Sequence, residues 1–511
     1  MQVRESASYL RNTFIGVTFA YLQIAVNLVQ GLIITPMCLS YVPEATFGAW
    51  LVTGNVLAWI GLLDPGVHLV IQQRIAAAHA NRDIQAISRL RTQAYALASL
   101  FALVALAAAV LAMPLHAMLV RRLGCEQPAQ VAAAYLFAAV ALSFFVASYG
   151  AAVVTLGNQA PAAHGAIAVV AQAVHLALVI VLLRSGMGIV ALSLGLLAQA
   201  VVNLSGNLAY SYLTMPPLGW PRVGALEGIS GLVRETRAVF LGRAGAALAS
   251  NSDMVIASWF LGAAPTVALN VTQRAPLMLR TLTERVSHAA TPVLSLMDAE
   301  HGHISRGAAT AAVVRAAMWL AIPSAAAILL WNHVFVNLWA GHGFYAGDRP
   351  NALIAFVLLA ASLETTFVNI CAALGLYAVS GRLLLVKSLL AIGMGCIGAR
   401  VFGVGGLLAA PLVAGAITTW WALPMAIGGH SAWSSERWYG LLIDALKGCA
   451  AAAFAAGLAT RVNVGDASAL AAAGLVFALV YAACLLCLSV DLRVLVIRLM
   501  GMNGGRSSWL R

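Results

Sequence analysis

Two residues of opposite charge lie deep inside adjacent apolar segments of this sequence. Asp253 stands in the segment 238–261, and Arg274 stands in the segment 264–286. Counted at about 1.5 Å per helical residue, Asp253 lies about 13 Å and Arg274 about 15 Å from the same edge. A charge at that depth in an apolar environment is costly and marks a candidate functional residue. The two side chains are predicted to pair, either as a permanent structural contact or as a pair that opens during function.

Three further charges occur within or at the ends of apolar segments. Glu364 lies about 20 Å into the segment 351–375 and is its only carboxylate. It is a candidate for coupling to a proton or a sodium ion, or else a neutral acid hydrogen-bonded to a neighbouring helix. Arg243 lies about one turn inside an apolar edge, where it could line a cationic vestibule or extend to the interface. Arg280 is interpreted in the same way.

Amide side chains form two polar stripes in the first half of the chain, each at helical spacing. The stripes are Gln23, Asn27 and Gln30, and Gln199, Asn203 and Asn207. An amide donates and accepts hydrogen bonds at once, which suits sugar hydroxyls. It also suits hydrogen bonds between helices, so cavity lining and helix packing are both open. His175 has no Cys or carboxylate companion nearby in the sequence, and we predict neither a metal site nor a cofactor.

The composition identifies the environment of these residues. Of the 511 residues 62% are hydrophobic and only 9% are charged, whereas a soluble domain carries about 25% charged residues. The chain could not cover a water-facing surface and is predicted to be a polytopic membrane protein. The net charge of +12 comes from residues scattered between apolar runs, not from one basic face, so nucleic acid is not expected as a partner.

A helical span needs roughly 20 apolar residues, and the sequence offers fourteen such segments. They lie near 13–36, 46–71, 93–115, 129–156, 165–183, 189–213, 238–261, 264–286, 313–336, 351–375, 383–402, 406–428, 441–461 and 468–490. With the N-terminus inside, 21 basic residues fall in inner segments and six in outer ones. Basic residues accumulate on the cytoplasmic side, which predicts that both termini are cytoplasmic.

The outer connections are short, which argues against a membrane enzyme with a large external catalytic loop. The inner run 214–237, "TMPPLGWPRVGALEGISGLVRETR", is rich in Pro and Gly and is predicted to link two halves. The expected organisation is a bundle of six helices over 1–213, this linker, a second six-helix bundle over 238–428, and two additional helices with a cytoplasmic tail over 429–511.

Two stretches carry a family resemblance. The run 39–83, "LSYVPEATFGAWLVTGNVLAWIGLLDPGVHLVIQQRIAAAHANRD", resembles the opening of the bacterial polysaccharide-biosynthesis flippases, the O-antigen-type exporters of lipid-linked oligosaccharides. The shared features are Phe47-Gly48, Trp50, Leu63-Asp64-Pro65-Gly66 and Arg82-Asp83. Pro65 departs from the family, which usually has an apolar residue there. Asp64 lies near the inner edge of its span and is interpreted as a helix cap rather than an ion-coupling group. The run 250–274, "SNSDMVIASWFLGAAPTVALNVTQR", is similar to that family's seventh helix and the start of its eighth.

The resemblance implies a place in the multidrug/oligosaccharidyl-lipid/polysaccharide (MOP) exporter superfamily, with an all-α fold of two six-helix bundles around a central cavity. It implies a flippase that moves a polyprenyl-pyrophosphate-linked oligosaccharide to the outer leaflet of the bacterial inner membrane. Guanidinium forks match phosphate oxygens. Substrate phosphate could therefore take Arg274 from Asp253, which would then accept a proton more readily.

Alternatives to this function remain open. A multidrug extruder of the same superfamily would favour carboxylates in its cavity, whereas the deep charges here include Arg243, Arg274 and Arg280. Lipid II or a teichoic-type precursor has similar headgroup chemistry. A polymerase or ligase, or a membrane scaffold, fits the sequence less well. The expected partners are the lipid-linked oligosaccharide, membrane lipids, H⁺ or Na⁺, and other polysaccharide-assembly membrane proteins.

Overall fold

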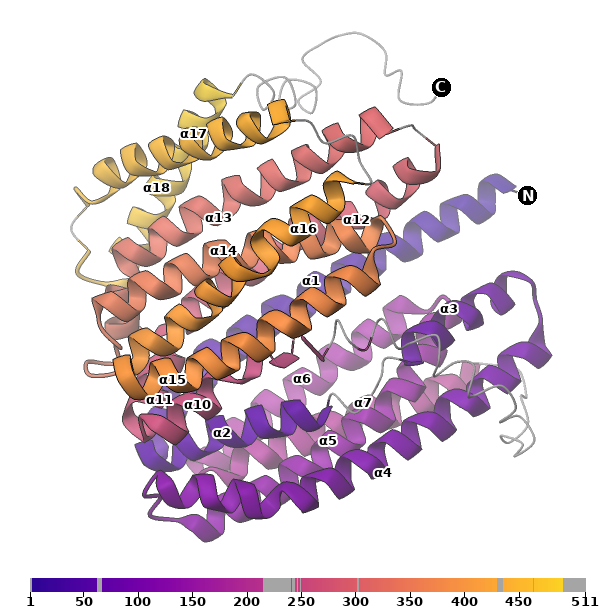
Figure 1. Cartoon of the computed structure of the whole chain (residues 1–511). Coiled ribbons are helices and arrows are strands. Elements are labelled where there is room, and N and C mark those ends of the chain that lie inside the picture. Colours follow the sequence, from indigo (N-terminus) through magenta and orange to yellow (C-terminus); the bar gives the residue numbers. More distant parts are fainter. Residues whose placement is uncertain are drawn as a thin grey trace. The chain divides into compact units, whose positions relative to one another are not determined.

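The computed structural model consists of α-helices joined mostly by short turns (Figure 1). It describes residues 2–61, 67–214, 240, 244–245, 247–248, 250–300, 303–429, 435–462 and 464–489, and these contain no β-strand. Asp64, Arg243 and all but the first residue of the predicted linker lie outside the described residues. What the sequence predicts for them stays a prediction.

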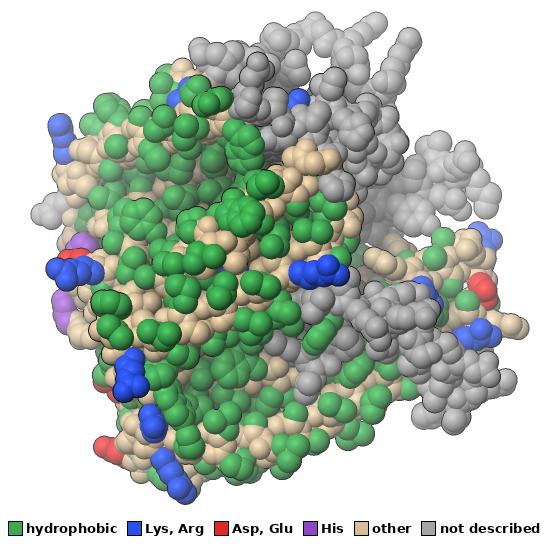
Figure 2. Space-filling model, viewed as in Figure 1, with side chains coloured by type: hydrophobic (Ala, Val, Ile, Leu, Met, Phe, Trp, Pro, Cys, Tyr) green, Lys and Arg blue, Asp and Glu red, His purple; other side chains and the backbone are tan. Residues whose placement is uncertain are grey.

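Ten stretches of the described chain are long and apolar enough to cross a membrane. Large apolar side chains on these helices are widely exposed, among them Leu111 at 80% and Phe402 at 75%. Figure 2 shows hydrophobic side chains spread over the described surface in view, with few charged side chains among them. Such a surface requires lipid rather than water around it, because exposed apolar area of this extent is unfavourable in water. The prediction of an all-α polytopic membrane protein is confirmed.

The ten stretches correspond to the fourteen predicted spans as follows. The stretch Tyr377–Gly428 contains two predicted spans. The second predicted span includes α2 (Glu44–Ile60) and the start of α3 (Val67–Ala80), and residues 62–66 between them lie outside the described residues. The seventh also contains residues outside the description, between 238 and 249, and ends in α10 (Asp253–Phe260). The eighth is divided between α11 (Ala263–Thr272) and α12 (Arg274–Glu300).

The two predicted spans inside Tyr377–Gly428 are separated by a reversal at Gly403. α15 (Tyr377–Ile417) contains this glycine at φ 63° and ψ −143°, a backbone conformation that only glycine adopts without strain. The two arms then approach closely, since a Cβ added to Gly398 would lie 2.6 Å from the backbone oxygen of Gly406. Small residues permit this approach, as is usual where membrane helices pack tightly.

One compact unit comprises residues 1–270 and 381–414. Besides α2, α3, α10 and most of α11 and α15, it contains α1 (Gln2–Tyr41), α4 (Ile84–Arg122), α5 (Pro128–Gly157), α6 (Pro161–Arg184) and α7 (Val190–Thr214). α5 packs against both α4 and α7, α6 packs against α1 and α7, and α10 packs against α2 and α4 (Figure 1). A core of buried aliphatic side chains, including Ile71, Leu97 and Val154, joins α3, α4 and α5.

A second compact unit comprises residues 271–380 and 415–511. Besides α12, it contains α13 (His303–Trp339), α14 (Asp348–Ala373), α16 (Thr419–Gly428), α17 (Ser435–Ala459) and α18 (Ala467–Leu488). α12, α13 and α14 pack against one another, and Ile328, Ala355 and Leu358 are buried where α13 meets α14. α17 packs against α13 and α18, which attaches the last two helices to this unit.

Candidate functional site

The amide stripe of α1 has one buried end and one exposed member. The Gln30 Nε2 atom donates a hydrogen bond to the backbone oxygen of Gln172 on α6 at 2.6 Å, and Gln30 is buried. Asn27 is exposed and Gln23 is half-buried. Gln30 therefore holds α1 against α6, whereas Asn27 and Gln23 stay accessible to a ligand.

The stripe of α7 follows the same pattern. The Nδ2 atoms of Asn203 and Asn207 donate to the backbone oxygens four residues earlier, at 3.1 and 2.9 Å. The Asn207 Oδ1 atom also lies 3.1 Å from Nδ1 of His164 on α6, and Asn207 is fully buried. Gln199 and Asn203 are half-buried. Both stripes thus use one amide to pack on α6, and the other amides are left for a polar ligand.

The two deep charges that the sequence paired both stand where a helix begins. Asp253 is the first residue of α10, after a bend at Ser252, and Arg274 is the first residue of α12, after a turn at Gln273. Both side chains are half-buried. Broken helices of this kind occur at the ion and substrate sites of secondary transporters. Asp253 belongs to the first unit and Arg274 to the second, and their pairing stays a prediction.

Arg280 is part of a polar contact between α12 and α14 that the sequence did not reveal. Its Nε atom lies 2.7 Å from Oε1 of Glu284, one turn further along α12. The same Glu284 oxygen accepts a hydrogen bond from the hydroxyl of Thr365 on α14 at 2.9 Å. The Arg280 and Glu284 side chains are 30% and 20% exposed. The guanidinium is therefore oriented by a carboxylate while part of it stays accessible.

This contact continues along both helices as a seam of side-chain hydrogen bonds. Thr283 and Ser362 lie 2.9 Å apart through their hydroxyl oxygens. One turn on, the Asn369 Nδ2 atom donates to the Ser287 hydroxyl at 2.8 Å. We call the seven residues of these contacts the α12–α14 seam: its members are Arg280, Thr283, Glu284, Ser287, Ser362, Thr365 and Asn369. The Arg–Glu spacing of i and i+4 was the sequence signal that could have found Glu284.

Glu364, the other predicted coupling residue, is buried on α14 with 7% exposure. It precedes Thr365, and adjacent residues of a helix point about 100° apart. The carboxylate therefore leaves α14 in a different direction from the seam hydroxyls. Among the described residues no group of three His, Cys, Asp or Glu side chains could hold a metal ion.

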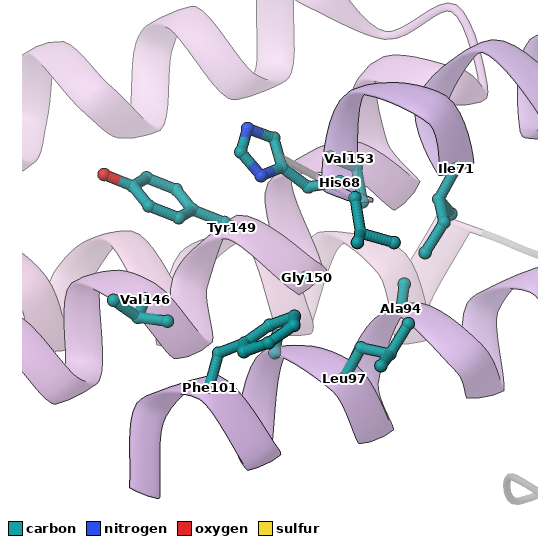
Figure 3. A pocket seen from close by; sticks show the side chains of 11 residues that line it. His68, Ile71, Ala94, Leu97, Phe101, Val146, Tyr149, Gly150 and Val153 are labelled. Carbon is teal, nitrogen blue, oxygen red and sulfur yellow. The ribbon is translucent and has the colours of Figure 1, made fainter. Parts of the chain in front are cut away.

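The first unit contains a small cavity between α3, α4 and α5 (Figure 3). Its volume is about 20 Å³, close to the space that one water molecule needs. His68 and Tyr149 stack at its edge, with ring centroids 5.2 Å apart, and aliphatic side chains such as Leu97 line the rest. A lipid-linked or drug-sized substrate could not enter a cavity of this size.

Known structures resemble this helical fold. A lipid II flippase, MurJ, in an inward closed conformation superposes with a TM-score of 0.70 at 12% identity, over 94% of this chain and 99% of that one. A multidrug resistance MATE family transporter of the MOP superfamily, inward-facing, gives 0.63 at 15% identity over 81% and 98%. The eukaryotic MATE transporter AtDTX14 gives 0.61 at 13% identity over 86% and 99%. No family model matches the sequence, and no curated protein matches it either.

The chain has the MOP exporter fold. The motifs around Phe47 and Asp253 indicated this fold, and the likeness to these structures confirms the fold. The MOP fold agrees with a multi-pass membrane protein. It also explains the broken helices at Asp253 and Arg274, because such breaks are a recurrent feature of transporter folds.

Proposed function

We propose that the protein is a flippase that moves a polyprenyl-pyrophosphate-linked oligosaccharide from the cytoplasmic to the outer leaflet by alternating access. The observation that carries this proposal is the charge of the first part of α12. Residues 274–290 contain three arginines, Arg274, Arg280 and Arg285, against one carboxylate, Glu284, and the other two carboxylates of the helix, Asp298 and Glu300, stand at its far end. The local excess of positive charge favours an anionic substrate, and a pyrophosphate supplies the anion.

In this proposal each predicted site residue has a role in binding or coupling. Arg274 binds the pyrophosphate at the start of α12 and leaves Asp253, which then takes up a proton more readily. Arg280 is kept in place by Glu284, and Arg243 belongs to the cationic inner vestibule. Glu364 is the second candidate for coupling to H⁺ or Na⁺. The sugar hydroxyls are bound by the accessible amides Gln23, Asn27, Gln199 and Asn203.

The proposal includes a location and an organisation. The protein lies in the bacterial inner membrane with both termini in the cytoplasm, as the arginine distribution predicts. Six-helix bundles over 1–213 and 238–428 enclose the central cavity, and the helices after residue 429 are an addition to them. Its products are used in polysaccharide or lipopolysaccharide assembly, so other membrane proteins of that assembly are expected partners.

A multidrug extruder is the second candidate, because MATE transporters share the fold at TM-scores of 0.63 and 0.61. Two observations favour the flippase. The likeness to the lipid II flippase extends over 94% of the chain, against 81% and 86% for these MATE transporters. A cavity for cationic drugs would also be expected to present carboxylates in excess over arginines.

The test is transport by the purified protein in proteoliposomes. A fluorescent lipid-linked oligosaccharide pyrophosphate and a cationic dye are offered to the wild type, to Arg274→Ala and to Arg400→Gln. Arg400 is exposed beside the Gly403 turn and is the matched control. We expect the wild type and the control to move the lipid-linked sugar and Arg274→Ala to lose at least tenfold in rate. Transport of the dye alone would establish the extruder instead.

A further inference from the structure

Two adjacent arginines end α4 on the side of the membrane where basic residues are scarce. Arg121 and Arg122 are both exposed and form the last turn of α4. In the proposed orientation they are two of only six basic residues in the outer segments. Basic residues at that side are disfavoured during insertion. A pair of neighbouring arginines there therefore points to a functional reason for their presence.

The arginines border an open hollow in the surface of α4. Its volume is about 550 Å³. It is lined by Pro114, Ala117, Met118, Arg121 and Arg122. Proline inside a helix removes a backbone hydrogen bond and bends the chain, and Ala117 adds little side-chain volume. The hollow is thus a consequence of the local sequence, and no carboxylate lines it.

Neighbouring elements of the same unit hold this end of α4 in place. The guanidinium of Arg122 lies over the ring of Trp259 on α10, 4.1 Å from its centroid, an attractive cation–π arrangement. The connection after α4 is tied to α2, since Thr46 Oγ1 lies 3.3 Å from Sγ of Cys125. Neither arginine forms an ion pair with a described carboxylate. Arg122 is thus oriented by Trp259, to whose backbone oxygen its Nη1 atom also donates at 3.5 Å, and the charges of both arginines are available to an anion.

An apolar stripe on the same helix leads to the hollow. Leu103, Leu111, Leu115 and Met118 are 65%, 80%, 48% and 47% exposed. Their spacing places them on one side of the helix. A molecule that lies along this stripe and ends at the arginines must have a long apolar chain and an anionic head.

We propose that this hollow binds the diphosphate end of a polyprenyl-diphosphate lipid in the outer leaflet, with the polyprenyl chain along the stripe of α4. The inference rests on the proposed function, because that function delivers such a lipid to the outer leaflet. Two guanidinium groups match the two phosphate groups of the diphosphate, each by paired hydrogen bonds. A phospholipid such as phosphatidylglycerol offers one phosphate and one negative charge. The charge balance therefore favours the diphosphate lipid.

The test measures binding of polyprenyl diphosphate to the full-length protein in nanodiscs of phosphatidylcholine. The variants are built on Arg274→Ala, so that the outer hollow is measured without the proposed central site. The double change Arg121→Gln and Arg122→Gln is compared with Arg184→Gln. Arg184 is an exposed arginine that ends α6 and has no basic neighbour in sequence. Polyprenyl monophosphate and phosphatidylglycerol are the competing ligands.

We expect Arg274→Ala to retain one saturable site, the double change to weaken it at least tenfold, and Arg184→Gln to leave it unchanged. Phosphatidylglycerol should compete at least tenfold less well than the diphosphate lipid. The proposal is overturned if the double variant binds polyprenyl diphosphate as tightly as Arg274→Ala does. It is also overturned if phosphatidylglycerol competes as well as the diphosphate lipid. The proposed function fails separately, if Arg274→Ala transports the lipid-linked sugar at the wild-type rate.

Discussion

Glu284 connects two other side chains of the α12–α14 seam, although it was not a candidate on sequence grounds. Its Oε1 atom receives Nε of Arg280 at 2.7 Å and the hydroxyl of Thr365 at 2.9 Å. Because a carboxylate already orients the arginine, the arginine loses less conformational freedom when it binds phosphate. Glu284 is therefore a residue that positions Arg280, and its removal tests the seam directly.

We expect Glu284→Ala to lower the free energy of unfolding by about 1 kcal/mol, since a charge-assisted contact is lost but solvent screens the partly exposed pair. Glu284→Gln keeps an acceptor for one donor and should cost less. Thr281→Ala, whose hydroxyl bonds its own helix at Leu277, is the control. Thermal unfolding in detergent measures all three. Equal midpoints in Glu284→Ala and the control would show that the pair contributes nothing to stability.

Individual side chains were the part of the site that sequence patterns predicted least. The amide spacing grouped Gln30 with Asn27, but only the packing against α6 shows that Gln30 is hydrogen-bonded there whereas Asn27 is exposed. The role of a polar residue in a membrane helix depends on which helix it faces. Hydropathy has no information on that contact, because it treats each span by itself.

The reversal at Gly403 is the feature of α15 on which its two arms depend. Its φ of 63° and ψ of −143° lie in a region that is essentially restricted to glycine. We expect Gly403→Ala to destabilise the protein by about 1–3 kcal/mol. Gly393→Ala is the matched control on the same helix, where an added Cβ meets no atom within 4 Å and alanine favours the helix. A lower midpoint of thermal unfolding for Gly393→Ala than for Gly403→Ala would contradict this account.

The last two helices are attached to α13 through Asp444. Its Oδ2 atom lies 2.6 Å from Nε of Arg315, and its Oδ1 atom lies 3.4 Å from Nζ of Lys447. On the same side, Trp319 donates to the backbone oxygen of Asp444 at 3.4 Å, and the Tyr481 hydroxyl of α18 donates to the backbone oxygen of Trp319 at 2.9 Å. Ion pairs and hydrogen bonds thus connect α13, α17 and α18, which otherwise pack through apolar side chains.

We expect Asp444→Ala to destabilise the protein by about 3 kcal/mol, because it leaves Arg315 largely buried without its carboxylate. Lys447→Ala should cost less, since its contact is longer and its side chain is 35% exposed. Hydrogen exchange of the α17 amides, together with thermal unfolding, measures the effect. Faster exchange confined to α17 and α18 is expected in Asp444→Ala. Unchanged exchange there would show that apolar packing alone holds these helices.

Helix positions were predicted well, whereas their internal breaks were predicted only in part. The period and length of apolar runs determine where a span lies, and each predicted span overlaps a described helix, the seventh through α10 at its end. The gap at residues 403–405 was visible in the sequence, where Gly403, Gly405 and Gly406 follow Phe402. The start of α12 at Arg274 was not, because the sequence around Gln273 contains no Gly and the nearest Pro is Pro276.

At the scale of the whole molecule, composition and two short motifs were sufficient to indicate the fold. The lipid II flippase superposes at only 12% identity, so the agreement lies in the number and order of apolar helices rather than in particular side chains. An apolar surface with few charges admits a small number of helical arrangements, since every backbone group must be satisfied within the span. Substrate and coupling ion depend on a few polar residues, and for that reason the fold leaves them open.

Two proposals depend on the predicted orientation of the molecule in the membrane. They are transport toward the outer leaflet and lipid binding at Arg121 and Arg122 in that leaflet. Asn81, in the connection between α3 and α4, and His342, in the connection between α13 and α14, are exposed positions for single cysteines. The predicted topology places the two on opposite sides of the membrane. The arginine bias places Asn81 in the cytoplasm. A membrane-impermeant maleimide should therefore label His342→Cys in intact spheroplasts and Asn81→Cys only after permeabilisation. The labelling of each variant is compared with that of the wild-type chain. The reverse pattern would place Arg121 and Arg122 in the cytoplasm, where basic residues are common. The scarcity of basic residues would then no longer support the outer-leaflet site.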